Sequence, residues 1–193
     1  SERRAERREQ GFDLVAIAGY TNAGKSTLLH RAADELSIEG MEPDHADLDG
    51  VAEAEDRLFK TLDTTTRRAT VDGRRVLLTD TVGLVDGIPH DLVASFSATL
   101  DAVADSDAAL LVADASDPLP DLREKLRVSL AELDDPEGEL LIALNKADLV
   151  DDDALDARRE AAAEIAGDRV GDVFAVSALE GDGIETLRDA VAG

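Results

Sequence analysis

One short stretch of the chain combines two glycines, a lysine and a serine at a spacing that suits phosphate binding. Residues 19–27 read GYTNAGKST, which fits the pattern G-x-x-x-x-G-K-[ST]. Gly19 and Gly24 let the backbone turn tightly, so that successive N–H groups can point into one concavity and bind phosphate oxygens. Lys25 adds a cation for the β- and γ-phosphates, and the Ser26 hydroxyl can ligate Mg²⁺. The alternative is an ordinary turn between a strand and a helix.

The segments on either side of this stretch favour the phosphate loop. An apolar run at 12–18 precedes it, and a helix-like stretch at 25–36 follows and adds its positive dipole end. We therefore expect the whole loop to contact a nucleotide. Its members are Gly19, Tyr20, Thr21, Asn22, Ala23, Gly24, Lys25, Ser26 and Thr27.

A second polar stretch, residues 145–148 with the sequence NKAD, can distinguish guanine from adenine. The Asp148 carboxylate can accept hydrogen bonds from both the ring N–H and the exocyclic amine of guanine, and adenine offers no such pair. Asn145 can brace the phosphate loop and reach the base edge, while the Lys146 stem can cover one ring face. A four-residue match is weak alone. Its place after the phosphate loop, at the end of a predicted strand, favours guanine over the adenine of an ATPase or kinase.

Ser177, Ala178 and Leu179 follow the last predicted strand and complete the expected base site. A backbone N–H near Ala178 can donate to the guanine carbonyl. The alternative is a plain strand-to-helix turn that Ser177 caps.

Residues between these motifs are candidates for sensing Mg²⁺ and the γ-phosphate. Asp80 ends a predicted strand, where it can hold Mg²⁺ through water, opposite Ser26. The Gly83 N–H can approach the γ-phosphate. One of the three threonines at 64–66 can close over Mg²⁺ while the γ-phosphate is present. Such a loop, tied down by the γ-phosphate and released on hydrolysis, would make the protein a molecular switch.

Apolar runs alternate with helix-like stretches along most of the chain. Strands are predicted at 12–18, 67–71, 74–79, 108–113, 140–144 and 173–176, and helices at 25–36, 91–103, 119–133, 154–165 and 184–192. The pattern predicts an α/β domain with the three-layer P-loop NTPase fold: a mostly parallel six-stranded sheet with one antiparallel strand and helices on both faces. We expect this domain to span 11–193. Residues 1–10 are expected to be a linker or the tail of a helix from a missing upstream domain.

The composition describes the solvent more than the partner. The chain has 193 residues, 44 Asp and Glu against 20 Lys and Arg, and a net charge of −24. Such a chain repels itself at low salt, and concentrated salt screens that repulsion, so the composition favours a halophilic archaeal origin. With no cysteine, no long apolar run and no resemblance to a signal peptide, a cytoplasmic location is expected.

The motifs in this order are those of P-loop GTPases, and four stretches resemble the HflX family of ribosome-associated GTPases. They read GYTNAGKSTL at 19–28, LFKTLDTTTRR at 58–68, DTVG at 80–83 and PHDLV at 89–93. The resemblance covers about residues 12–192. It departs from the family pattern at Thr64 and Leu84, where the family commonly has Pro and Phe, and the segment between 36 and 58 is longer than usual.

The resemblance implies a GTPase that hydrolyses GTP to GDP and phosphate with Mg²⁺ and associates with the large ribosomal subunit. It makes Thr65 the Mg²⁺-sensing threonine, beside Ser26 and Asp80, and gives catalytic roles to Lys25, Thr65, Gly83 and Asn22. In related GTPases the residue matching Asn22 helps to bind K⁺ near the transferring phosphate; the alternative is an asparagine that only braces the loop. The family's N-terminal domain, which helps to bind the ribosome, is absent from this chain.

Three further points stay open at the level of sequence. Leu84 stands where many GTPases have a glutamine that orients water, which predicts slow hydrolysis alone and keeps open a GTP-sensing module that barely hydrolyses. Another ribosome- or RNA-associated P-loop GTPase is a further alternative. The arginines around the predicted hairpin can contact rRNA phosphates or can protect an edge strand by their charge. They are Arg67, Arg68, Arg74 and Arg75.

Overall fold

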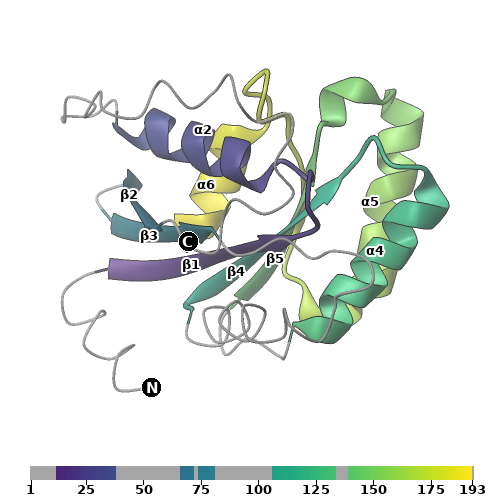
Figure 1. The fold of residues 1–193 in the computed structure, drawn as a ribbon, viewed down its shortest axis with the longest axis horizontal. Helices are drawn as coiled ribbons and strands as arrows, with labels where there is room; N and C mark the ends of the chain where they lie inside the picture. Colours follow the sequence, from purple (N-terminus) through teal and green to yellow (C-terminus); the bar gives the residue numbers. More distant parts are fainter. Residues whose placement is uncertain (1–11, 38–65, 72–73, 81–105, 134–138, 193) are drawn as a thin grey trace.

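The computed structural model describes residues 12–37, 66–71, 74–80, 106–133 and 139–192, which form one sheet flanked by helices (Figure 1). The strands are β1 (Phe12–Gly19), β2 (Thr66–Val71), β3 (Arg74–Asp80), β4 (Ala108–Asp114), β5 (Glu139–Asn145) and β6 (Val173–Ala175). The longer helices are α2 (Lys25–Ser37), α4 (Leu119–Glu132), α5 (Asp152–Ala166) and α6 (Ile184–Ala192). Two short 3₁₀ helices, η3 (Ala147–Leu149) and η4 (Gly167–Arg169), were not predicted from the sequence.

The strands lie in the order β2-β3-β1-β4-β5-β6. β1 pairs in parallel with both β3 and β4, β4 with β5 and β5 with β6, while β2 runs antiparallel to β3. The predicted α/β class, with a parallel sheet and helices, is therefore confirmed. The predicted helix at 91–103, the polar segment before residue 66 and the hairpin turn lie outside the described residues.

The parallel pairing brings the expected functional segments to one edge of the sheet. Asp80 at the end of β3 lies opposite Ile17 of β1, two residues before Gly19. Asp114 at the end of β4 lies opposite Asn145 at the end of β5. Ligands of such sheets bind at the carboxyl ends of the strands, so this edge is where a site is expected.

Both faces of the central strands are buried, as their continuous apolar sequences require. In β1 and β4 the side chains alternate between the faces. Val15, Ile17, Leu110 and Val112 pack toward α2 and α6, while their neighbours Ala16, Ala18, Ala109 and Leu111 pack toward α4 and α5. Figure 1 shows the two helix pairs on opposite sides of the sheet. The domain therefore has one hydrophobic core on each side of the sheet.

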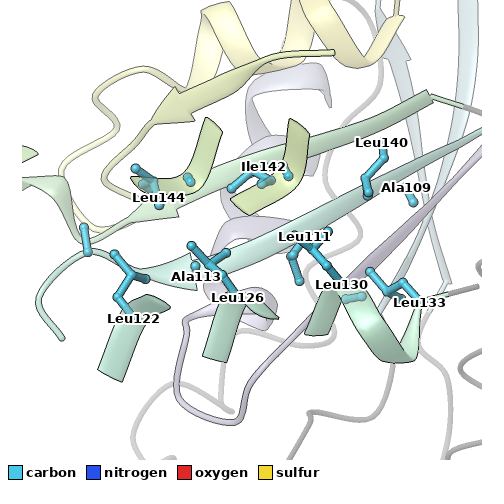
Figure 2. Close-up of a cluster of buried hydrophobic side chains, with 14 of the residues drawn as sticks. Ala109, Leu111, Ala113, Leu122, Leu126, Leu130, Leu133, Leu140, Ile142 and Leu144 are labelled. Atoms are coloured by element: carbon cyan, nitrogen blue, oxygen red, sulfur yellow. The ribbon is translucent and has the colours of Figure 1, made fainter. Parts of the chain in front are cut away.

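The core beneath α4 and α5 is built largely from leucines that meet the sheet end to end (Figure 2). Leu122, Leu126 and Leu130 recur along α4 at spacings of four residues, so they share one face of that helix. They pack against Leu111, and Ile142 is likewise fully buried. Burying each such side chain contributes about 1.5–3 kcal/mol before entropy is counted.

Local signals fix the ends of α5. The Asp151 carboxylate accepts a hydrogen bond from the Ala154 N–H at 2.8 Å, which satisfies one of the free donors of the first turn. The helix stops at Gly167, whose φ of 57° favours glycine. Among the described residues, the structure contains no helix that is long and apolar enough to cross a membrane.

Candidate nucleotide-binding site

The loop between β1 and α2 has the backbone conformation that its glycines permit. Gly19 has a φ of 144°, and a Cβ there would lie 2.1 Å from the backbone oxygen of Val112 in β4. Ala23 N–H donates to the Tyr20 carbonyl at 3.2 Å, and Leu28 N–H donates to the Gly24 carbonyl at 2.9 Å as α2 begins. The first turn of a helix therefore points its N–H groups toward the loop, as anion binding requires.

Gly24 is required for a different reason. Its φ is 88°, and a Cβ there would lie 2.3 Å from Nδ2 of Asn145 at the end of β5. The glycine thus lets the phosphate loop and the residue expected to read the base approach each other closely.

Lys25 and Asn22 also have defined places in the loop. The Lys25 side chain lies back over the loop, where its Nζ donates to the Tyr20 carbonyl at 3.0 Å, and the residue is buried. A buried ammonium beside backbone N–H groups suits a polyphosphate, which supplies the negative charge. Asn22 is exposed and has a φ of 67°, a left-handed conformation that asparagine tolerates better than most residues.

Asn145 joins the two halves of the expected site. Its Nδ2 donates to the Ala23 carbonyl in the phosphate loop, and its Oδ1 accepts from the Ala178 N–H, each at 2.9 Å. A carbonyl on one side and an N–H on the other leave only one orientation for the amide. Asn145 is 2% exposed, so both hydrogen bonds are shielded from water. The predicted brace between the base motif and the phosphate loop is present.

Residues 177–182 form a tight turn after β6. Ser177 Oγ accepts from the Glu180 N–H at 3.0 Å, and the Ser177 carbonyl accepts from the Gly181 N–H at 2.8 Å. Ser177 therefore closes this turn rather than capping α6, which begins at Ile184. The side chain of Leu179 at the tip of the turn is 72% exposed, an unusual position for a large apolar residue.

Arg31 of α2 holds the turn from the other side. Its Nε donates to the Ala178 carbonyl at 3.2 Å, and one terminal nitrogen donates to the Leu179 carbonyl at 2.6 Å. The helix that follows the phosphate loop is thereby connected to the expected base-reading turn. No spacing rule pointed to Arg31 in the sequence.

Lys146 extends from β5 toward β4, where its Nζ forms an ion pair with Oδ2 of Asp114. The other carboxylate oxygen accepts from the Ser116 N–H at 2.9 Å and from the Ser116 hydroxyl. Burial by itself raises the pKa of Asp114, but hydrogen bonds from Lys146 and Ser116 outweigh it and hold this pKa below its ordinary value of 3.8. Asp114 was missed from the sequence, although its position at the end of a predicted strand was a signal.

Tyr20 of the phosphate loop packs against α4. Lys125 Nζ lies 5.7 Å from the centre of the Tyr20 ring and donates to Oδ2 of Asp117 at 2.8 Å. Between the loop and α4 lies a cavity of about 200 Å³, lined by Asn22, Leu122 and Ser129 among others. The loop is thus supported on both sides, by Asn145 and by α4.

The residues expected to bind Mg²⁺ are only partly described. Ser26 lies exposed in the first turn of α2, and the backbone of Asp80 ends β3 at the same edge of the sheet. A hydroxyl and a carboxylate are the hard oxygen ligands that Mg²⁺ prefers, so the donor types fit the ion. Thr65, Gly83 and Leu84 lie outside the described residues.

Asp148 and the arginines are placed without contacts that decide their roles. Asp148 lies in η3, and its side chain is exposed. The predicted arginines sit on β2, an edge strand of the sheet, and at the start of β3. They are Arg67, Arg68, Arg74 and Arg75.

Comparison with known proteins adds family and fold. A family model described as "50S ribosome-binding GTPase" matches residues 14–146. A GTPase HflX of Thermococcus kodakarensis is 41% identical over 195 residues, covering 98% of this chain and 40% of that protein. A GTPase HflX of Magnetococcus marinus is 39% identical over 186 residues, covering 95% of this chain and 38% of that protein. The chain therefore spans well under half the length of these relatives.

Among solved structures, the chain resembles a GTP-binding protein from the archaeon Sulfolobus solfataricus in complex with GDP. The TM-score is 0.69 at 26% identity, and the match covers 99% of this chain and 54% of that one. The matched family model covers well over half of the chain and includes both the phosphate loop and Asn145. This chain belongs to the 50S ribosome-binding GTPase family, and it is a G domain of the HflX type.

Proposed function

We propose that this domain binds GTP and GDP and hydrolyses GTP to GDP and phosphate as a molecular switch. One observation carries the proposal: the Asn145 amide joins the Ala23 carbonyl of the phosphate loop to the Ala178 N–H of the turn after β6. Three distant segments are thereby assembled into one site at the carboxyl edge of the sheet. The HflX relatives and the GDP complex of the archaeal GTP-binding protein support the same ligand.

The residues of the chain would share the work as follows. The N–H groups of the phosphate loop and the Lys25 ammonium bind the β- and γ-phosphates and stabilise charge that develops in the transition state. Ser26, Asp80 and Thr65 would hold Mg²⁺, which when bound neutralises charge on the phosphate oxygens. Asp148 accepts from the guanine edge, and the Gly83 N–H approaches the γ-phosphate.

The base assignment is tested by binding. Affinities for GDP, GTP and ATP are measured in concentrated KCl, which screens the charge of −24. We expect GDP and GTP to bind and ATP to bind at least about 100-fold more weakly, the range seen where a site's polar groups would otherwise be left without partners. Equal affinities for ATP and GTP would remove the proposal.

Slow hydrolysis in isolation follows from Leu84, which cannot orient water. We expect single-turnover GTP hydrolysis to accelerate when large ribosomal subunits are added, because a partner would have to supply the ordering that a glutamine gives elsewhere. Turnover that stays negligible with the subunit present would favour the alternative, a GTP-sensing module. Fast hydrolysis by the domain alone would contradict the expected role of Leu84.

Association with the large ribosomal subunit is the proposed cellular context, supported by the description of the family. Co-sedimentation with large subunits in the presence of a non-hydrolysable GTP analogue tests it, with GDP as the comparison. Charge-reversed Arg67 and Arg68 test whether β2 contacts rRNA phosphates. Unchanged sedimentation of that variant would leave these arginines the role of protecting an edge strand.

A K⁺ ion is a further proposed cofactor, bound with the help of Asn22. The side chain is exposed at the loop, as a ligand requires, although the left-handed backbone explains an asparagine equally well. Hydrolysis rates in KCl and NaCl at matched ionic strength decide between the two. A rate at least about tenfold higher in KCl supports the ion, because added positive charge there lowers the barrier by more than about 1.4 kcal/mol.

A further inference from the structure

The turn at 177–182 has its hydrogen-bond donors almost fully committed. The Ser177 N–H donates to the Asp182 carbonyl, the Gly181 N–H to the Ser177 carbonyl and the Glu180 N–H to Ser177 Oγ. The Ala178 N–H, at the position where the sequence predicted a donor to guanine, donates to Asn145. Of residues 177–181, only Leu179 has an N–H for which the described part of the chain provides no acceptor.

Arg31 fixes the peptide group that carries this N–H. In a trans peptide the carbonyl of one residue and the N–H of the next point in opposite directions. The Ala178 carbonyl points to Arg31 Nε at 3.2 Å. The Leu179 N–H therefore points away from α2. The second contact, from Arg31 to the Leu179 carbonyl at 2.6 Å, holds the next peptide group as well.

An arginine suits this role because its planar fork can engage two carbonyls at once, which a lysine cannot reproduce. The link is long-range: Arg31 and Leu179 are 148 positions apart in the chain. The turn is thus held by Asn145 through an N–H and by Arg31 through two carbonyls. Both of its flanking peptide groups are fixed before any ligand arrives.

We propose that the Leu179 N–H is the donor that reads the guanine carbonyl, and that Arg31 is the positioning residue that aims it. This inference rests on the proposed function and deepens it, because it names the group that recognises the O6 edge of the base. Asp148 would read the opposite, amine-bearing edge. Arg31 itself touches no substrate and acts through the peptide group.

The test compares GDP with 6-thioguanosine diphosphate, which keeps the ring N–H and the amine but replaces O6 by sulfur, a weak acceptor. Wild type should prefer GDP by about tenfold, the effect of one good hydrogen bond in a shielded site. Arg31→Ala should lower GDP affinity about tenfold and bring the two affinities within about twofold of each other. Arg31→Lys should fall between the two. Arg159→Ala, which removes an exposed arginine of α5, is the matched control and should change neither affinity.

An NMR measurement on the unmutated chain keeps the proposal testable if Arg31→Ala fails to fold. The amide proton of Leu179 should shift downfield when GDP is added and shift much less with 6-thioguanosine diphosphate. The amide proton of Ala178 should respond little, because it already donates to Asn145. A GDP-dependent shift at Ala178 in place of Leu179 would overturn the assignment.

The two levels of the argument fail separately. If wild type does not prefer GDP to ADP, the proposed function is wrong and the inference falls with it. If wild type prefers GDP to ADP but Arg31→Ala keeps the full preference for GDP over the thio analogue, only the inference is wrong. An equal loss of affinity for both nucleotides would show that Arg31 acts on general stability and would likewise overturn it.

Discussion

The two halves of this site are held in different ways. The phosphate half is a contiguous loop whose shape comes from backbone geometry, with Gly19 and Gly24 at positive φ and Asn22 in the left-handed region. The base half is assembled from distant segments, and side-chain hydrogen bonds hold it together. Asn145 connects to a residue 122 positions away, and Arg31 to one 147 positions away. One half is therefore specified locally and the other by the completed fold.

This difference has an energetic consequence. A loop fixed by backbone conformation loses its shape only when a residue incompatible with that conformation is introduced. A turn fixed by buried side-chain hydrogen bonds loses its shape when one partner is removed, and the groups left behind stay unsatisfied. The phosphate half should therefore be sensitive to added atoms, and the base half to removed ones.

The largest effect is expected at the point where the halves touch. Gly24→Ala would place a methyl group 2.3 Å from Asn145 Nδ2 at a φ of 88°, so the loop and the brace cannot both keep their places. We expect GDP affinity to fall by more than about 100-fold, equivalent to about 2.7 kcal/mol, measured by calorimetric titration.

Gly167→Ala is the matched control for that substitution. Gly167 also has a positive φ, of 57°, but a Cβ there would have no atom within 4 Å among the described residues. It should cost about 1–2 kcal/mol in stability from backbone strain and leave GDP affinity unchanged. If Gly24→Ala behaves like Gly167→Ala, the close approach of the two halves is not needed for binding.

Removing the brace should damage the base half even without nucleotide. Asn145→Ala leaves the Ala23 carbonyl and the Ala178 N–H without their partner, and each buried group costs about 1–3 kcal/mol. We expect the free energy of unfolding to fall by about 2–4 kcal/mol in urea titrations of the nucleotide-free protein. A loss below about 0.5 kcal/mol would mean that water replaces the amide at no cost.

The same contrast explains what could be predicted from the sequence. The phosphate loop, the alternation of strands and helices and the NKAD motif are local patterns, and the structure shows them close to where they were expected. Arg31 and Asp114 could not be assigned, because their importance comes from partners that only the folded sheet brings near. Arg31 gave no signal, since a helical arginine is ordinarily solvated, whereas Asp114 had one in its strand-end position. The 3₁₀ helix at Ala147–Leu149 was missed because three residues carry no periodicity.

Changing the base reader should alter specificity without altering stability. Asp148 is exposed in η3, so Asp148→Asn is expected to leave the unfolding free energy within about 0.5 kcal/mol of wild type. Its GDP affinity should fall at least tenfold, by about 1.4 kcal/mol, because an amide cannot accept from both guanine donors. Competition between GDP and xanthosine diphosphate should shift in favour of the latter. An unchanged preference for GDP would remove Asp148 from the base site.

The smallest effect concerns the ion pair at the edge of the base half. Asp114→Asn removes the partner of Lys146, and because both side chains are mostly shielded we expect a loss of about 1 kcal/mol at pH 7. The pKa of Asp114 in the folded protein lies below 3.8, so its carboxylate stabilises the fold above that pH, and this contribution is lost as the pH falls through the lowered pKa. The gap in unfolding free energy between wild type and Asp114→Asn should therefore shrink between pH 7 and pH 3. Asp156→Asn, which removes an exposed ion pair with Arg159, should show almost no gap at either pH. A gap for Asp114→Asn that stays constant down to pH 3 would show that the carboxylate acts through its shape rather than its charge, and the base half would then depend on hydrogen bonding alone.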